Sequence, residues 1–180
     1  MNRFISNMLK IYCIVALMFV LFLACSSKNT VLVKIHEGEY DELGVKSGYI
    51  NFKGDTIISL DSYHYCYTDT FKKYAIVLKH GGGCVAIDQN ENELFEVYWC
   101  DNGPDIISDG LFRIRKNGKV GFANDEGQIV IEPIYECATP FKNGLAKVTY
   151  DCSLKKEEEH TKMESDSWFY IDYTGNLIQE

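Results

Sequence analysis

The chain repeats a short pattern of β-prone runs and glycine turns, and this repeat constrains the fold more than any other feature. The run GLFRI at 110–114 recurs as GLAKV at 144–148. Between the two runs, an Asn-Gly pair at 117–118 and a Glu-Gly pair at 126–127 separate short segments rich in aromatic and β-branched residues. Such spacing is typical of antiparallel hairpins. A repeat of hairpins predicts an array of similar units.

A second element of the pattern occurs four times along the chain. With VGFANDEG at 120–127 as the template, the other copies begin at Ser47, Cys84 and Trp168. The interval is 37 residues, then 36, then 48. The last interval is longer because it contains an insertion at 153–167 that is rich in Lys and Glu.

Each copy is predicted to be a three-stranded antiparallel meander. In the third copy the strands are expected at 111–115, 119–124 and 128–132. One meander cannot bury its own apolar face, so neighbouring units must stack. We therefore expect an all-β array of about four three-stranded antiparallel β-meander repeats, with propeller-like closure as the alternative. The insertion at 153–167 carries no apolar face and is expected to be a solvated excursion between strands.

The third copy also matches most of a known repeat pattern. The matching positions are Gly121, Phe122, Gly127, Ile129, Val130, Pro133, Ile134, Tyr135, Phe141, Gly144, Leu145 and Ala146. On these residues the sequence resembles the WG-repeat family, over roughly 47–180. The Trp-Gly pair that names the family is replaced here by Val120-Gly121 and, in the fourth copy, by Trp168-Phe169. The resemblance implies a β-repeat fold and no particular activity.

The N-terminal segment has the features of an export signal. Arg3 and Lys10 precede an apolar run at 11–24, which is too short for a comfortable membrane span. The run ends at Cys25 after a small residue, and this junction resembles the lipobox of bacterial lipoproteins. The resemblance implies that residues 1–24 are a lipoprotein signal peptide and that Cys25 carries the lipid. An uncleaved N-terminal anchor is the alternative.

This interpretation divides the chain into three parts. Residues 25–46 are expected to form a lipid-anchored segment with the first strand, and residues 47–180 the WG-like β-repeat domain. Ser-Ser-Lys-Asn-Thr follows Cys25, without acidic residues. We therefore expect the protein in the bacterial cell envelope, anchored to the outer membrane and facing the periplasm. Contact with the membrane would be through the N-terminal lipid only.

Charge and cysteine content restrict the partners further. The chain has 26 acidic and 18 basic residues, and this excess of negative charge excludes nucleic acid as a partner. Apart from Cys13 and Cys25, an odd number of cysteines remains, and one or two disulfides are plausible outside the cytoplasm. Their pairing stays open, as does burial as small apolar side chains. These cysteines are Cys66, Cys84, Cys100, Cys137 and Cys152.

Aromatic side chains supply the candidate binding surface. The chain contains 12 Tyr, 10 Phe and 2 Trp, and they are dense around residues 63–74 and 98–99. Tyr and Trp anchor protein interfaces and stack on sugars. The predicted binding surface consists of Tyr63, Tyr65, Tyr67, Tyr98 and Trp99. Ordinary filling of a β-sheet core is the alternative.

Two patterns suggest metal or phosphate sites, but both have simpler explanations. Asp88, Asn90 and Asn92 have the spacing of a calcium loop, yet the later positions lack its Gly and Glu, and a polar turn is expected there. The segment HGGGC at 80–84 lacks the Lys-Ser/Thr of a phosphate loop and reads as a hairpin turn.

A zinc site is the third pattern of this kind. His64 and Cys66 could join His80 and Cys84, but nothing places the two pairs together. No metal and no cofactor are therefore expected.

The sequence thus predicts a non-enzymatic envelope lipoprotein whose β-repeat surface mediates protein–protein interaction. The alternative is a glycan or cell-wall binding module that uses the Tyr/Trp cluster. No Ser–His–Asp, Cys–His or paired-carboxylate arrangement stands in a recognisable nucleophile context, so an enzyme, such as a hydrolase, is the least favoured hypothesis.

Overall fold

The computed structural model describes residues 30–100, 102–157 and 160–178. Residues Val31–Glu180 form one compact unit. The apolar run at 11–24 and the candidate lipidation site Cys25 lie outside the described residues. Within the described residues there is no helix, so none is long and apolar enough to cross a membrane.

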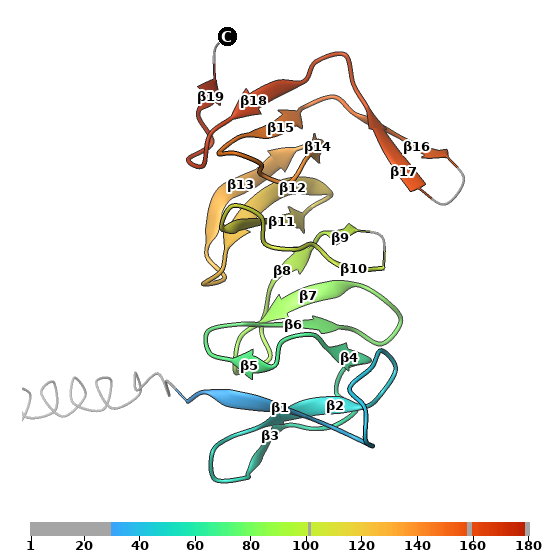
Figure 1. The fold of residues 1–180 in the computed structure, drawn as a ribbon, viewed down its shortest axis with the longest axis vertical. Coiled ribbons are helices and arrows are strands. Elements are labelled where there is room, and N and C mark those ends of the chain that lie inside the picture. The colour runs from blue at the N-terminus through green and yellow to red at the C-terminus, as the bar shows by residue number, and fades with distance from the viewer. Residues whose placement is uncertain (1–29, 101, 158–159, 179–180) are drawn as a thin grey trace, which may run out of the picture. The chain divides into compact units, whose positions relative to one another are not determined.

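The described residues form antiparallel sheets that follow one another through the compact unit (Figure 1). The first sheet has the order β3-β2-β1-β5, with β1 Leu32–His36, β2 Ser47–Ile50, β3 Thr56–Ile58 and β5 Thr70–Phe71. The central sheet has seven strands in the order β13-β12-β11-β8-β7-β6-β4. Its strands are β4 Tyr65–Cys66, β6 Ala75–Leu78, β7 Cys84–Ile87, β8 Glu93–Val97, β11 Leu111–Lys116, β12 Lys119–Asn124 and β13 Ile129–Tyr135.

The last large sheet and two small hairpins complete the fold. The last large sheet has the order β14-β15-β18-β19, with β14 Cys137–Ala138, β15 Ala146–Thr149, β18 Phe169–Ile171 and β19 Leu177–Ile178. The two-stranded hairpins are β9 Trp99–Cys100 with β10 Gly103–Pro104, and β16 Ser153–Glu157 with β17 His160–Glu164.

The all-β repeat fold is confirmed. The described residues contain four three-stranded meanders: β1-β2-β3, β6-β7-β8, β11-β12-β13 and β15-β18-β19. We refer to them as the first to fourth repeats. The second and third repeats are joined at their edges, because β8 pairs with β11 through Val97↔Ile114 and Glu96↔Arg115. Stacking alone was expected from the sequence. The charged insertion at 153–167 contains the β16–β17 hairpin.

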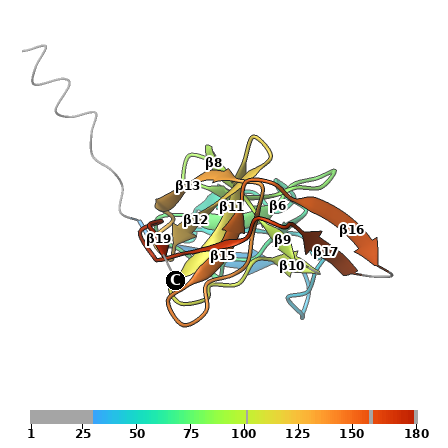
Figure 2. The ribbon, with the colours of Figure 1, turned by 90° about the horizontal axis from the view of Figure 1, so that it is seen from above.

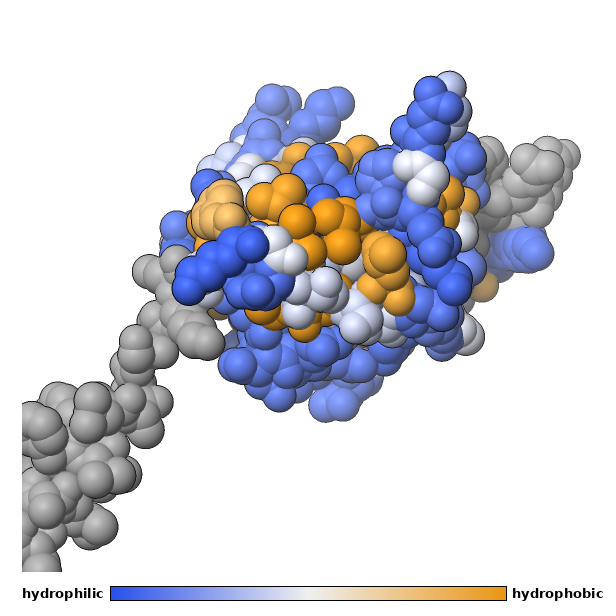
Figure 3. Space-filling model, turned by 90° about the horizontal axis from the view of Figure 1, so that it is seen from below, coloured by the Kyte–Doolittle hydropathy of each residue, from blue (hydrophilic) through white to orange (hydrophobic). Residues whose placement is uncertain are grey.

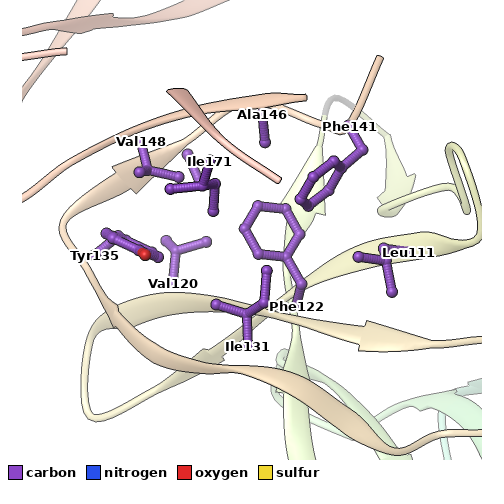
Figure 4. Close-up of a cluster of buried hydrophobic side chains, with 10 residues drawn as sticks. Leu111, Val120, Phe122, Ile131, Tyr135, Phe141, Ala146, Val148 and Ile171 are labelled. Carbon is purple, nitrogen blue, oxygen red and sulfur yellow. The ribbon is translucent and has the colours of Figure 1, made fainter. Parts of the chain in front are cut away.

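Three buried apolar clusters lie between successive repeats. Leu32 and Tyr49 of the first repeat meet Val85 and Ile87 of the second. Cys84 and Ala86 face the other way and pack against Phe112, Ile114 and Ala123 of the third repeat. The third cluster joins the third and fourth repeats, and Figure 4 shows the rings of Phe122 and Phe141 next to each other within it. Their ring centroids are 4.8 Å apart. The inner strands are therefore apolar on both faces.

One turn recurs in all four repeats and explains the polar residue that ends or directly follows each middle strand. These residues are Asn51, Asp88, Asn124 and Asp172, and each side-chain Oδ1 accepts hydrogen bonds from the backbone N–H groups two and four residues later. Such Asx turns satisfy backbone donors that the sheet leaves unpaired. The turn also requires a left-handed residue, which is glycine in three copies and Glu91 in the second (φ +62°).

The Asx turn of the fourth repeat predicts a specific pH dependence. The Thr174 hydroxyl and the backbone N–H of Asn176 hydrogen-bond the Asp172 carboxylate and lower its pKa to about 2, from 3.8. A carboxyl with a depressed folded pKa contributes stability above its unfolded pKa, and the contribution is lost as the pH falls through the folded pKa. The unfolding temperature should therefore drop between pH 4 and pH 2.

The matched control is present within the chain itself. Asp172→Asn keeps an Oδ1 acceptor, as Asn51 and Asn124 do in equivalent turns. Thermal unfolding followed by circular dichroism at several pH values should show a smaller acid-induced drop for Asp172→Asn than for the wild-type protein. Identical pH profiles would show that the carboxylate contributes nothing through this turn.

Candidate functional site

Two hairpins interrupt the repeat, and both project to the same side of the compact unit. The β9–β10 hairpin lies between the second and third repeats, and the β16–β17 hairpin is inserted within the fourth. Figures 1 and 2 place both on one side of the stacked sheets. Insertions in repeat proteins gather on one face, which is often the binding face. We call the surface formed by β9, β10, Ile106, Ile107, β16 and β17 the hairpin face.

Alternation along the chain turns Tyr98 inward and leaves Trp99 at the surface. The Tyr98 ring packs against the core between the third and fourth repeats, with the Arg113 guanidinium 4.3 Å from its centroid. Trp99 is 42% exposed. The two aromatic neighbours therefore have different roles, one in the core and one on the hairpin face.

A buried ion pair holds the base of the first hairpin. The Nε of Arg113 donates to Oδ2 of Asp105 at 2.9 Å, and its second terminal nitrogen donates to Oδ1 at 2.6 Å. The backbone N–H of Arg113 adds a bond to Oδ2 at 2.8 Å, and both side chains are almost fully buried. Desolvation would lower the pKa of the Arg113 guanidinium, but the hydrogen bonds to Asp105 outweigh it and raise that pKa. Such bidentate pairing gives fixed geometry.

Immediately after this pair the chain exposes two large apolar side chains. Ile106 is 82% exposed, and Ile107 is also exposed. Asp105, the residue before them, is held inside by Arg113 and by a hydrogen bond from its backbone N–H to the carbonyl oxygen of Tyr98 at 2.8 Å. The rigid base therefore presents Ile106 and Trp99 to solvent from one short segment.

The second hairpin is fixed at its base by a covalent bond. Cys152 precedes β16 and forms a disulfide with Cys137 of β14, which is one of the pairings that the sequence left open. At the end of β17, the hydroxyls of Ser165 and Thr149 lie within hydrogen-bond distance at 2.9 Å. Leu154 is exposed on β16, and an ion pair links Lys155 with Glu164. Such cross-links restrict the orientations of the hairpin.

The other three predicted binding residues pack into the core. Tyr63 packs against the cluster between the first and second repeats, and Tyr67 packs against the next cluster. Tyr65 is almost buried and donates its hydroxyl hydrogen to Asp41 at 3.0 Å. The Tyr65 and Tyr67 rings meet edge to face, with centroids 4.9 Å apart. The structure thus brings these two rings together in the core, whereas Trp99 is exposed.

The calcium and glycine patterns have structural roles. Oδ1 of Asp88 accepts the N–H groups of Asn90 and Asn92, and Oδ2 accepts the Asn92 side chain, as in the other Asx turns. The glycines at 81–83 form the hairpin turn between β6 and β7, with positive φ at each.

The zinc pattern is divided between two parts of the core. The centroids of the His64 and His80 rings are 6.0 Å apart, but Cys66 and Cys84 are buried in different clusters. Among the described residues, no group of three His, Cys, Asp or Glu side chains could hold a metal ion.

Comparison with family models gives one match, to the WG containing repeat, over residues 121–151. The chain carries a WG repeat. The matched segment runs from the middle of β12 through β13 and β14 to the end of β15, so it spans the boundary between the third and fourth repeats. Comparison with curated proteins and with solved structures gives no match. The WG-repeat assignment therefore describes the architecture and leaves activity to the geometry of the surface.

Sequence reasoning missed Asp105, Ile106 and the roles of the hairpins. Residues 111–115 alternate Leu111, Arg113 and Arg115 with Phe112 and Ile114, which is typical of a half-buried strand, but Arg113 is buried. A partial signal exists in the acidic residue of Gly103-Pro104-Asp105, which stands in an otherwise poorly patterned segment. Its partner cannot be read from the sequence because eight residues and a turn separate the two.

Proposed function

We propose that the protein is a non-enzymatic envelope lipoprotein whose hairpin face binds a protein partner. The observation that carries this proposal is the projection of both hairpins from the same side of a WG-repeat array. The exposed Trp99 and Ile106, held by the buried Asp105–Arg113 pair, have the character of interface anchors. The constrained second hairpin projects on the same side and carries charged side chains, among them the Lys155–Glu164 pair, as the rim of a protein interface does.

Cross-linking in cells, followed by affinity capture of the full-length protein and mass spectrometry, tests this proposal. Trp99→Ala combined with Ile106→Asp should reduce recovery of the main cross-linked protein about tenfold or more, since loss of a central Trp anchor typically weakens binding by 2 kcal/mol or more. Ile134→Asp is the matched control, because Ile134 is 49% exposed on β13, outside the hairpin face. Equal recovery from both variants would refute binding through this face.

Glycan binding is the second candidate, because the ring of Trp99 is partly exposed and an exposed indole stacks on sugars. Retention of the full-length protein on cell-wall polysaccharide should then fall with Trp99→Ala and persist with Ile106→Asp. Loss with both variants and recovery of one protein in the capture experiment would favour the protein partner.

Lipid anchoring is a separate part of the proposal and has its own test. Cells labelled with a radioactive fatty acid should incorporate label into the wild-type protein but not into Cys25→Ser. Cys100→Ser is the control, since Cys100 is an exposed free thiol in the structure. Label retained in Cys25→Ser would contradict lipidation at this residue.

A further inference from the structure

Because side chains alternate along its strands, the first sheet has one face that packs against the second repeat and one face that is partly exposed to solvent. Leu32, Tyr49 and Ile58 point to the second repeat and are buried. Lys34 lies on the same side as Leu32, where its Nζ contacts Asp41 at 2.5 Å and Asp69 at 2.7 Å. The other face carries Val33, Ile35, Ile50 and Ile57, of which Val33 is 40% and Ile57 42% exposed.

In every later repeat the equivalent face is covered by the preceding repeat. The positions equivalent to Ile50 are Ile87, Ala123 and Ile171, and all three are buried in clusters shared with the preceding repeat. The first repeat has no preceding repeat among the described residues. The outer face of the first repeat therefore carries apolar side chains, as the internal faces do. Unlike theirs, several of its side chains are exposed to solvent.

The two ends of the array differ in this respect. On the outer side of the fourth repeat, Lys147 pairs with Tyr170 across the strands, and its Nζ lies 5.2 Å from the centroid of the Tyr170 ring. Polar capping of this kind keeps the terminal unit of a repeat array soluble. Within the part of the chain that the structure describes, the first repeat has no equivalent cap on its outer face.

We define the terminal face as Val33, Ile35, Ile50 and Ile57, together with Phe52 in the turn between β2 and β3. Phe52 is 76% exposed. Figure 3, which looks at this end of the array, shows apolar side chains gathered in one patch with hydrophilic residues around it. An exposed apolar patch with a polar rim marks an interaction site.

We propose that the terminal face docks on the lipid surface of the membrane that anchors Cys25; this inference rests on the proposed lipidation. Residues 25–30 separate the lipid site from Val31, and six residues span at most about 21 Å when fully extended. The tether enters the compact unit at β1, which is itself a strand of the terminal face. The apolar patch is thus confined close to the bilayer by the chain length alone.

Charge selects the kind of lipid. The chain carries 26 acidic and 18 basic residues, so it has an excess of negative charge. Anionic head groups repel this negative charge, so docking is to a neutral, zwitterionic surface. The contact buries apolar side chains at the interface and adds to the attachment given by the N-terminal lipid.

Depth-dependent fluorescence quenching in vesicles tests the docking. The full-length protein is reconstituted into phosphatidylcholine vesicles, with or without bromine on the acyl chains. Phe52→Trp adds an indole to the terminal face, and Leu177→Trp adds one to β19 at the other end of the array, where Leu177 is also exposed. Both variants keep Trp99 and Trp168, so the difference between their quenching by brominated lipid reports on the added indole ring.

Brominated lipid should reduce the emission of the indole added by Phe52→Trp about twofold, since an interfacial side chain sinks roughly 5–10 Å into the headgroup boundary. The indole added by Leu177→Trp should be unaffected. Adding Val33→Glu to Phe52→Trp should abolish the quenching. Adding Val130→Glu should preserve it, because Val130 has similar exposure on β13.

Three results would overturn the inference in distinguishable ways. Equal emission in both lipids, with protein still bound to the vesicles, would refute docking and leave the lipid anchor standing. Protein that fails to float with the vesicles would refute docking and anchoring together. Protection from aqueous acrylamide without quenching by brominated lipid would assign the terminal face to a second copy of the chain.

Discussion

Asp105→Ala should lower the free energy of unfolding by about 3–5 kcal/mol, because removing one partner of a buried ion pair leaves the other charge without compensation. Arg113 is 3% exposed, and its guanidinium donates two hydrogen bonds to the Asp105 carboxylate. The remaining bond from Arg113 to the carbonyl oxygen of Ala138 cannot neutralise the charge. Urea unfolding followed by tryptophan fluorescence measures the change.

The control for this prediction is an exposed ion pair of the same type. Lys79 contacts Glu93 at 3.0 Å, and both side chains are exposed. Glu93→Ala should change stability by about 1 kcal/mol or less, as for most surface pairs. If Asp105→Ala and Glu93→Ala had equal effects, the buried pair would not hold the first hairpin. Asp105→Ala should also weaken partner capture, because it loosens the segment that presents Ile106.

Gly121→Ala should destabilise the protein by about 3 kcal/mol, the upper part of the usual range for overpacking a core. A Cβ at position 121 would lie 2.5 Å from the carbonyl oxygen of Ile131 and 2.6 Å from the backbone nitrogen of Pro133. These are backbone atoms, so no side-chain rotation relieves the clash. The register of β12 and β13 shifts at this point, which brings the two chains unusually close.

Gly103→Ala is the matched substitution at a glycine without this constraint. A Cβ there has no atom within 4 Å, and the backbone of Gly103 is not left-handed. Its free energy of unfolding should stay within about 0.5 kcal/mol of the wild-type value. A small effect at both positions would show that β13 can move away from β12. Calorimetry of the two variants under identical conditions separates these outcomes.

Gly121 also explains which part of the repeat pattern is structurally required. Gly48 holds the equivalent place in the first repeat and meets the backbone of β3 in the same way. In the second repeat Val85 occupies this position, and there the strand pairs regularly with Glu96. Glycine is thus needed where the backbone of the following segment approaches the middle strand too closely to leave room for a Cβ. The preceding Trp of the pattern is not needed at this contact, since Ser47 and Val120 stand there.

The candidate site was only partly predictable. The density of aromatic residues predicted both Tyr98 and Trp99 as surface positions, and of these two Trp99 is exposed whereas Tyr98 packs against the core. Tyr63, Tyr65 and Tyr67 could not be assigned to the core or to the surface from the sequence, since a segment dense in aromatic residues fits either. Their neighbours in the core come from other repeats, and those neighbours decide the burial.

The sequence by itself determined the all-β repeat, its period and its turns. Asx turns, glycine turns and strand alternation act over only a few residues, so their signals are written locally at positions such as Asn124 and Gly127. Only the tertiary structure decided the pairing of β8 with β11, the Cys137–Cys152 disulfide, the Asp105–Arg113 pair and the uncovered face of the first repeat. Each depends on which segments distant in the sequence come into contact. The free energy that stabilises these contacts comes from burying whole apolar sheet faces against each other.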